Sequence, residues 1–210
     1  MAATKQRREN PAIGGRPAKI SRNSILDAAR QLGAHELTFA RIAGRLGVRQ
    51  QSLYYHFASR EELLHALAVQ LSKEFDLQPG DSKKWRRWLE DTALRFYDLL
   101  TNNPAVLDGS NWRGLASFGM PIMEAALMTL EGAGYTLEEA GQIWDMVGAL
   151  VYAQARLLTD ARTIGPIPAF RDADEIAGQP VPRSLAYHAI AEKDPRKRIA
   201  RMLHRLVISF

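Results

Sequence analysis

Helical spacing of apolar residues runs through this sequence from Ser21 to its end, and it constrains the fold more than any other feature. Apolar side chains recur three and four residues apart in one segment after another, and no segment shows the convincing every-second-residue alternation of a strand. There is no internal repeat and no low-complexity tract. The spacing predicts an all-α protein of about nine or ten helices.

Capping residues and glycines divide this pattern into segments. Ser59 with Glu62 and Thr136 with Glu139 form two capping boxes that predict helix starts, and Gly47 ends a short helix. A shorter apolar segment covers about residues 104–117, and residues 163–182 hold several prolines and glycines and are expected to form a loop. The predicted helices cover about residues 21–32, 38–46, 49–57, 59–75, 82–101, 120–132, 136–162, 183–193 and 195–209.

The chain divides into an arm and two helical parts. Residues 1–19 are rich in Lys, Arg, Gly and Pro and predict a flexible basic arm. The sequence Gln78-Pro79-Gly80-Asp81 is a clear break. We therefore expect a small N-terminal domain with a linking helix at residues 20–75, and a larger C-terminal helical bundle at residues 81–210.

Charge is distributed unevenly between these parts. Residues 1–60 carry 11 lysines and arginines against 3 acidic residues, a balance of +8, whereas residues 61–210 carry 17 against 20, a balance of −3. This asymmetry favours a polyanion as the partner of the first 60 residues, the alternative being a solvated basic face without a partner.

Several classes of protein are disfavoured by composition and motifs. The chain has no cysteine and hence no disulfide framework or Cys-ligated metal, and its five histidines show no metal-binding spacing. No GxSxG motif, glycine-rich phosphate loop or other catalytic constellation is present, so we expect neither an enzyme nor a cofactor. The polar, basic N-terminus does not resemble a signal peptide, and no run approaches 18 apolar residues, so we expect a cytoplasmic protein.

The first helices follow the helix-turn-helix pattern: a helix, a short helix, a tight turn with a glycine, and another short helix. Leu53 and Phe57 share one side of the last helix and would anchor it. The opposite face carries groups that bind base edges or phosphates, and two adjacent exposed tyrosines are costly unless they meet a partner. These groups are Arg49, Gln50, Gln51, Ser52, Tyr54, Tyr55 and His56.

The stretch LTFARIAGRLGVRQQSLYYHFASREELLHAL, residues 37–67, closely resembles the DNA-binding domain of TetR-family repressors. The LYYHF at residues 53–57, followed by a capped helix, is a distinctive signature of that family. The resemblance covers about residues 16–75, and beyond them it extends only to helical organisation. It implies a regulator that binds double-stranded operator DNA as a homodimer and responds to a small-molecule effector.

In that family the helix carrying LYYHF enters the major groove. The resemblance therefore implies base contacts from Gln50, Gln51 and Tyr54, and contacts of either kind from Arg49. It implies phosphate contacts from Thr38, Ser52, Tyr55, His56 and Arg60. Structural roles are the alternatives: Tyr54 packing between helices, His56 bonded at a helix end, Arg60 serving only its helix. Arg16 in the arm would meet a minor groove or a phosphate, or belong to a tail that helps solubility.

The C-terminal half is rich in aromatic and methionine residues, which line cavities in some helical proteins and form ordinary core in most. By resemblance, a ligand pocket would be lined by Trp112, Phe118, Met123, Trp144 and Gln154. A dimer surface would use the helix at 136–162 and the last helix, in which apolar residues recur at helical spacing; the alternative is that this stripe packs within its own chain. Its residues would be Val147, Val151, Ile199, Met202, Leu203, Leu206 and Phe210.

The sequence thus predicts a DNA-binding repressor released from its operator by a small, mostly apolar ligand. One alternative keeps DNA binding and drops the ligand. The other, from a different class, is a helical scaffold or enzyme with an accidental resemblance.

Overall fold

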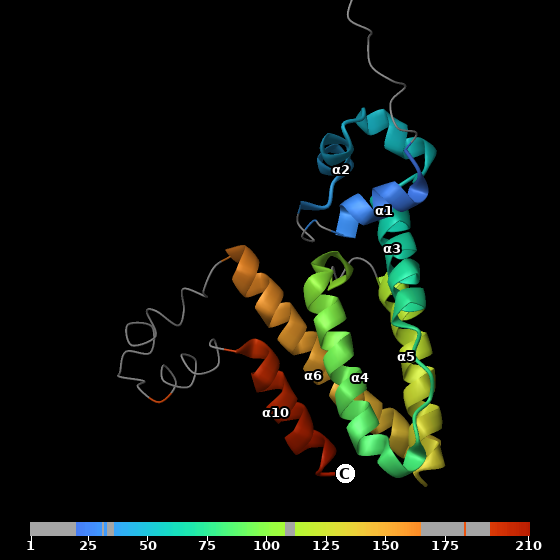
Figure 1. The fold of residues 1–210 in the computed structure, drawn as a ribbon, viewed down its shortest axis with the longest axis vertical. Helices are drawn as coiled ribbons and strands as arrows, with labels where there is room; N and C mark the ends of the chain where they lie inside the picture. Colours follow the sequence, from blue (N-terminus) through green and yellow to red (C-terminus); the bar gives the residue numbers. More distant parts are fainter. Residues whose placement is uncertain (1–19, 31, 33–35, 108–111, 165–182, 184–193) are drawn as a thin grey trace, which may run out of the picture.

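The computed structural model describes residues 20–30, 32, 36–107, 112–164, 183 and 194–210, and for residues 112–118 and 163–164 the backbone alone. All regular structure in this part is helical, which confirms the all-α prediction (Figure 1). The helices are α1 (Arg22–Arg30), α2 (Phe39–Leu46), η2 (Gln50–Tyr55), α3 (Arg60–Phe75), η3 (Ser82–Lys84), α4 (Trp85–Asn102), η4 (Pro104–Leu107), α5 (Trp112–Gly132), α6 (Leu137–Ile164) and α10 (Pro195–Val207), where η marks a 3-10 helix.

Helices α1, α2 and η2 form a small unit at one end of the molecule, which we call the head (Figure 1). Its centre is built from fully buried side chains, among them Ile25, Ile42 and Leu53. Gly47 ends α2 in the left-handed conformation, with φ of 65°, a conformation that glycine adopts without the steric cost of a Cβ atom. The predicted glycine turn is therefore present between α2 and η2.

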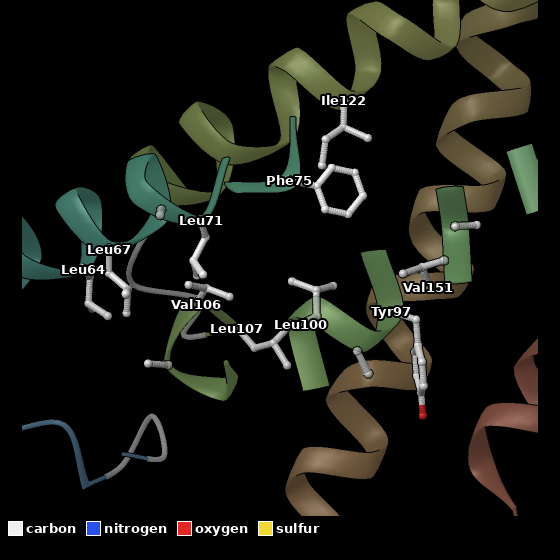
Figure 2. Packing of buried hydrophobic residues seen from close by; sticks show 14 of the residues in the cluster. Leu64, Leu67, Leu71, Phe75, Tyr97, Leu100, Val106, Leu107, Ile122 and Val151 are labelled. Carbon is white, nitrogen blue, oxygen red and sulfur yellow. The ribbon is translucent and has the colours of Figure 1, made fainter. Parts of the chain in front are cut away.

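The linking helix α3 begins at the predicted capping box. The Glu62 amide donates to Ser59 Oγ at 3.2 Å, while the Glu62 carboxylate accepts from the Ala58 amide at 2.7 Å, one residue before the cap. Helix α3 then descends from the head and packs mainly along α5 (Figure 1). Figure 2 shows Leu71 of α3 pointing toward Val106 of η4, with further buried leucines of α3 beside it.

The C-terminal bundle consists of α4, α5, α6 and α10, with α6 packed on both α4 and α5. We expected a shorter apolar segment at 104–117 and a separate helix at 120–132. The structure instead has a single turn of 3-10 helix at 104–107 and one helix from 112 to 132, which continues through Pro121. Burial of Ile122, Ala126 and Leu130 along one face of α5 offsets the backbone hydrogen bond that the proline removes.

Two arginines tie the end of α3 to its neighbours. Arg30, the last residue of α1, donates to Glu74 at 2.8 Å and to the buried Asn103 at 3.3 Å. Arg95 of α4 donates to the Phe75 carbonyl at 2.8 Å. The end of α1 is therefore tied both to α3 and to the end of α4. The predicted helix at 183–193 and most of the predicted loop at 163–182 lie outside the described residues.

Candidate nucleic-acid interface

The recognition segment, residues 49–57, is wound more tightly than the sequence predicts. We expected a short helix from Arg49 to Phe57, whereas residues 50–55 form a 3-10 helix in which the Ser52 amide bonds the Arg49 carbonyl at 2.9 Å. An element of this length gains few α-helical hydrogen bonds, so its winding follows the positions of its buried anchors. Those anchors are Leu53 and Phe57, 0% and 1% exposed, as the spacing predicted.

The opposite face of the recognition segment is open to solvent. Arg49, Gln50 and Gln51 are exposed, and Tyr55 is the most exposed large apolar residue described, at 87%. Ser52 and the His56 side chain are half-buried. The structure thus brings the predicted base-contacting groups together on one surface of the head.

Tyr54 combines an exposed face with an internal contact. It is 52% exposed, yet its ring lies 4.7 Å, centroid to centroid, from the ring of Phe39 in α2. Packing between helices, the alternative role for this residue, therefore coexists with exposure of about half of its surface. The pair fixes the tyrosine at the rim of a shallow cavity of about 430 Å³. The cavity is lined by Thr38, Phe39, Ala40, Gln50, Tyr54, Ala58, Ser59 and Arg60.

Two helices begin at this cavity, α2 after Thr38 and α3 after Ser59. Helix N-termini carry partial positive charge and attract phosphate groups. Thr38 caps α2 by accepting from the Arg41 amide at 3.2 Å and is itself exposed. The Arg60 Nε donates to the Leu37 carbonyl at 3.0 Å, so this arginine also braces the start of α2. Both residues therefore have a structural role besides the phosphate contact expected of them.

Sequence reasoning missed Arg22, which lies against the end of the recognition segment. Its guanidinium carbon is 4.1 Å from the centroid of the Phe57 ring, and its Nη1 donates to the His56 carbonyl. Nothing local signals this role, because the partners lie 34 and more residues further along the chain. Arg16, the remaining predicted DNA contact, lies outside the described residues.

The residues expected in a ligand pocket lie in the bundle, with Trp144 buried and Met123 and Gln154 half-buried. The side chains of Trp112 and Phe118 lie outside the described part. No metal-holding group of three or more His, Asp or Glu side chains occurs among the described residues.

The residues expected at a dimer surface are mostly inside their own chain. Four of them are at most 1% exposed and therefore pack within their own chain, which was the alternative prediction: Val147, Val151, Ile199 and Leu203. They lie on α6 and α10, which pack against α4 and against each other. Met202, Leu206 and Phe210 are half-buried.

Comparison with known proteins connects this geometry to a family. Residues 25–67 match the family model described as bacterial regulatory proteins, tetR family. The chain is 35% identical over 85 residues to the class D tetracycline repressor of Escherichia coli, covering 38% of this chain and 39% of that protein. The match thus spans about two-fifths of that relative. An HTH-type transcriptional repressor of Mycobacterium tuberculosis is 27% identical over 195 residues, 88% of this chain and 73% of that one.

Solved structures share the fold over nearly the whole chain. TetR from Acinetobacter baumannii AYE superposes with a TM-score of 0.65 at 21% identity, covering 91% of this chain and 97% of that one. ActR from Streptomyces coelicolor in complex with actinorhodin gives a TM-score of 0.65 at 22% identity, with the same coverage. The conclusion has two parts: residues 25–67 match the tetR family of bacterial regulatory proteins, and the chain as a whole shares the fold of solved TetR structures.

Proposed function

We propose that the protein is a sequence-specific DNA-binding repressor that a small, mostly apolar ligand releases from its operator. The observation that carries this proposal is the recognition segment, a row of exposed polar and aromatic side chains held on buried anchors. Apart from the packing of Tyr54 on Phe39, this surface faces solvent, and the basic balance of residues 1–60 suits a polyanion.

The most exposed polar side chains of the recognition segment are the candidates for base contacts. Gln50 and Gln51 are exposed and carry amides that can bond adenine bidentately, and the half-exposed Tyr54 carries a hydroxyl that can bond a base. Arg49 is exposed at the start of the segment and can serve a base or a phosphate. Phosphates would be held around the two helix starts. The residues proposed for phosphate contacts are Arg16, Thr38, Ser52, Tyr55, His56 and Arg60.

A homodimer follows from the size of this surface, because one short element reads too few base pairs for useful specificity. An exposed apolar stripe on α6 supports the proposal. Met146 and Leu157 are 44% and 48% exposed, and the exposed Ala149 and Ala153 lie between them at helical spacing. A second copy of α6 packed on this stripe, with α10 beside it, would form an intersubunit four-helix bundle. Met202, Leu206 and Phe210 of α10 would contribute the partly exposed apolar surface.

The effector would bind among the helices of the bundle, where Met123, Trp144 and Gln154 lie, together with Trp112 and Phe118. Solved proteins of this fold include ActR bound to actinorhodin and a TetR variant bound to minocycline. The protein would act in the cytoplasm, and no helix among the described residues is long and apolar enough to cross a membrane. We propose no enzymatic activity, since the surface described is suited to binding.

The test begins with selection of duplexes from a randomised library by the wild-type protein. The enriched duplex and a scrambled duplex of equal composition are then compared by fluorescence anisotropy at several salt concentrations. We expect a ratio of affinities of about a thousand or more, and a steep fall of both affinities with salt. Absence of any enriched duplex would contradict the proposal.

A matched pair of variants locates the activity. Gln50→Ala should reduce discrimination by about 1–3 kcal/mol, the usual loss for one base contact. Gln142→Ala, an equally exposed glutamine on α6 whose amide bonds Glu138 at 3.4 Å, should change nothing. Equal behaviour of the two variants would place DNA reading elsewhere.

Effector control is tested by titrating actinorhodin and minocycline, with a wider set of apolar compounds, in the presence and absence of the enriched duplex. A ligand that releases the operator must bind more weakly when the duplex is present, by the factor through which it weakens DNA binding. Equal affinities for every compound that binds would favour the alternative, a DNA-binding regulator without a small-molecule effector.

A further inference from the structure

Arg22, the first residue of α1, connects α1 both to the recognition segment and to the start of α3. Its guanidinium lies over the Phe57 ring, 4.1 Å from the centroid. Its Nη1 donates to the His56 carbonyl, at the end of the recognition segment. Both Nη1 and Nη2 lie 3.2 Å from Oε1 of Glu62, in the first turn of α3. One planar group therefore contacts the end of the recognition segment and the start of the linking helix.

Glu62 completes this arrangement, which we call the Arg22 clamp. While Oε1 binds Arg22, Oε2 accepts from the Ala58 amide at 2.7 Å, and the Glu62 amide donates to Ser59. The amide of Ala58 and the guanidinium of Arg22 together hold the pKa of Glu62 below its usual range. The short connection between the recognition segment and α3 is thus held on both sides.

We propose that Arg22 is a positioning residue for DNA reading: it sets the angle between the recognition segment and α3, and thereby the aim of the base-reading side chains. The inference rests on the proposed function and goes beyond it, because Arg22 itself need touch no base. The 3-10 helix within the recognition segment is only six residues long and has few hydrogen bonds of its own. Its orientation must come from such outside contacts and from its buried anchors.

Positioning affects the two kinds of DNA contact differently. Base contacts need donors and acceptors aligned within a narrow geometry, whereas phosphate contacts position the protein and tolerate small shifts. Loosening the clamp should therefore weaken binding to the enriched duplex and leave binding to scrambled DNA nearly unchanged. Lysine cannot replace Arg22, because an ammonium cannot stack on a ring while donating to a carbonyl and a carboxylate in one plane.

A direct phosphate contact is the competing role for Arg22, whose side chain is 50% exposed. The two roles differ in salt dependence. Loss of a phosphate contact weakens all DNA alike and reduces the slope of log affinity against log salt by about 0.9. Loss of a positioning contact changes the ratio of specific to non-specific affinity and leaves the slope as it was.

The experiment compares Arg22→Lys, Arg22→Gln and Glu62→Gln in the full-length protein, using the enriched and scrambled duplexes of the preceding test. We expect each variant to lower the specific-to-non-specific ratio about tenfold, the scale of one weakened base contact. Glu62→Gln also removes a negative charge from the head, so it should bind scrambled DNA slightly more tightly even as the ratio falls.

Arg30→Lys is the matched control. Arg30 lies at the other end of α1 and makes a comparable pair with Glu74, 2.8 Å apart, away from the recognition segment. It should leave the ratio unchanged. Thermal unfolding of every variant, compared with that of the control, separates a change of reading from a general loss of stability.

The outcomes are distinguishable. A ratio unchanged in Arg22→Lys and Glu62→Gln, while wild-type protein still discriminates, overturns the inference alone. A smaller salt slope in Arg22→Gln, with both duplexes weakened equally, assigns Arg22 to a phosphate and also overturns it. If wild-type protein enriches no duplex, the proposed function fails and the inference fails with it.

Discussion

Tyr54 offers a sharp test because its ring and its hydroxyl are assigned different tasks. The ring packs against Phe39 at 4.7 Å. The hydroxyl has no hydrogen-bond partner among the described residues and lies on the exposed side of the head. Tyr54→Phe removes only the hydroxyl, whereas Tyr54→Ala removes the ring as well.

The size of each effect follows from burial. A fully buried tyrosine removes about 150–250 Å² from water, and Tyr54 is 52% exposed, so about 100 Å² is at stake. At about 25 cal/mol per Å² this is about 2.5 kcal/mol as an upper estimate, and the aromatic pair adds about 0.5–1.5 kcal/mol. The unfolded chain already buries part of this area, which reduces the sum, so we expect Tyr54→Ala to lower the free energy of unfolding by about 2–3 kcal/mol, and Tyr54→Phe to leave it unchanged.

Tyr54→Phe, which should leave stability unchanged, is expected to impair discrimination between DNA sequences. Tyr54→Phe should reduce discrimination between the enriched and scrambled duplexes by about 1–3 kcal/mol if the hydroxyl meets a base. Urea unfolding measures stability and anisotropy measures discrimination, both at one protein concentration. Tyr55→Ala is the matched control for packing: its side chain is 87% exposed, so its loss should change stability by no more than about 0.5 kcal/mol.

Two results would refute this reasoning. If Tyr54→Ala destabilised no more than Tyr55→Ala, the contact with Phe39 would contribute nothing. If Tyr54→Phe discriminated as well as wild-type protein, the hydroxyl would not read DNA, and Tyr54 would have the packing role alone.

Three further predictions concern pH, the turn and the dimer. The Ala58 amide and Arg22 lower the pKa of Glu62 in the folded protein, so the contribution of Glu62 to stability is present above its ordinary pKa of 4.5 and is lost as the pH falls through the lowered pKa. The difference in unfolding free energy between wild type and Glu62→Gln should therefore narrow from about pH 6 to pH 3. A difference that stays constant with pH would contradict the clamp. Gly47→Ala should cost about 1–2 kcal/mol in urea unfolding, because φ is +65° although a Cβ would meet no atom within 4 Å, and a cost near zero would mean that the turn relaxes. Leu157→Glu should convert dimers to monomers in light scattering, and the monomer should keep its unfolding temperature because Leu157 is 48% exposed within its own chain. A variant that stays dimeric would show that the α6 stripe is not the dimer interface.

Features that depend on residues three or four apart were predictable from the sequence. The capping box at Thr136 forms as expected, with the Thr136 amide bonding Glu139 at 2.8 Å, and at Ser59 the cap forms while the Glu62 carboxylate accepts from the preceding amide, that of Ala58. Gly47 adopts the left-handed conformation, and Leu53 and Phe57 are buried. Each of these depends on local hydrogen bonds or local spacing, which one chain segment contains in full.

Apolar spacing identifies a buried face but does not name what buries it. Val147, Val151, Ile199 and Leu203 have the spacing of an interface, and the structure places them against other helices of the same chain. Intrachain and intersubunit packing use the same residues at the same intervals, so periodicity alone cannot separate them. The exposed stripe containing Met146 and Leu157 emerges only when the folded chain shows which apolar residues remain uncovered.

The sequence by itself determined the helical class, most helix starts and the composition of the recognition segment. Tertiary structure decided the 3-10 winding of that segment, the continuation of α5 through Pro121 and the contacts of Arg22 with residues 34 and 40 positions away. The reason is physical. Capping and helical spacing are local, whereas the winding of a short element, the tolerance of a proline and the partner of a long cation depend on which surfaces meet when the chain has packed.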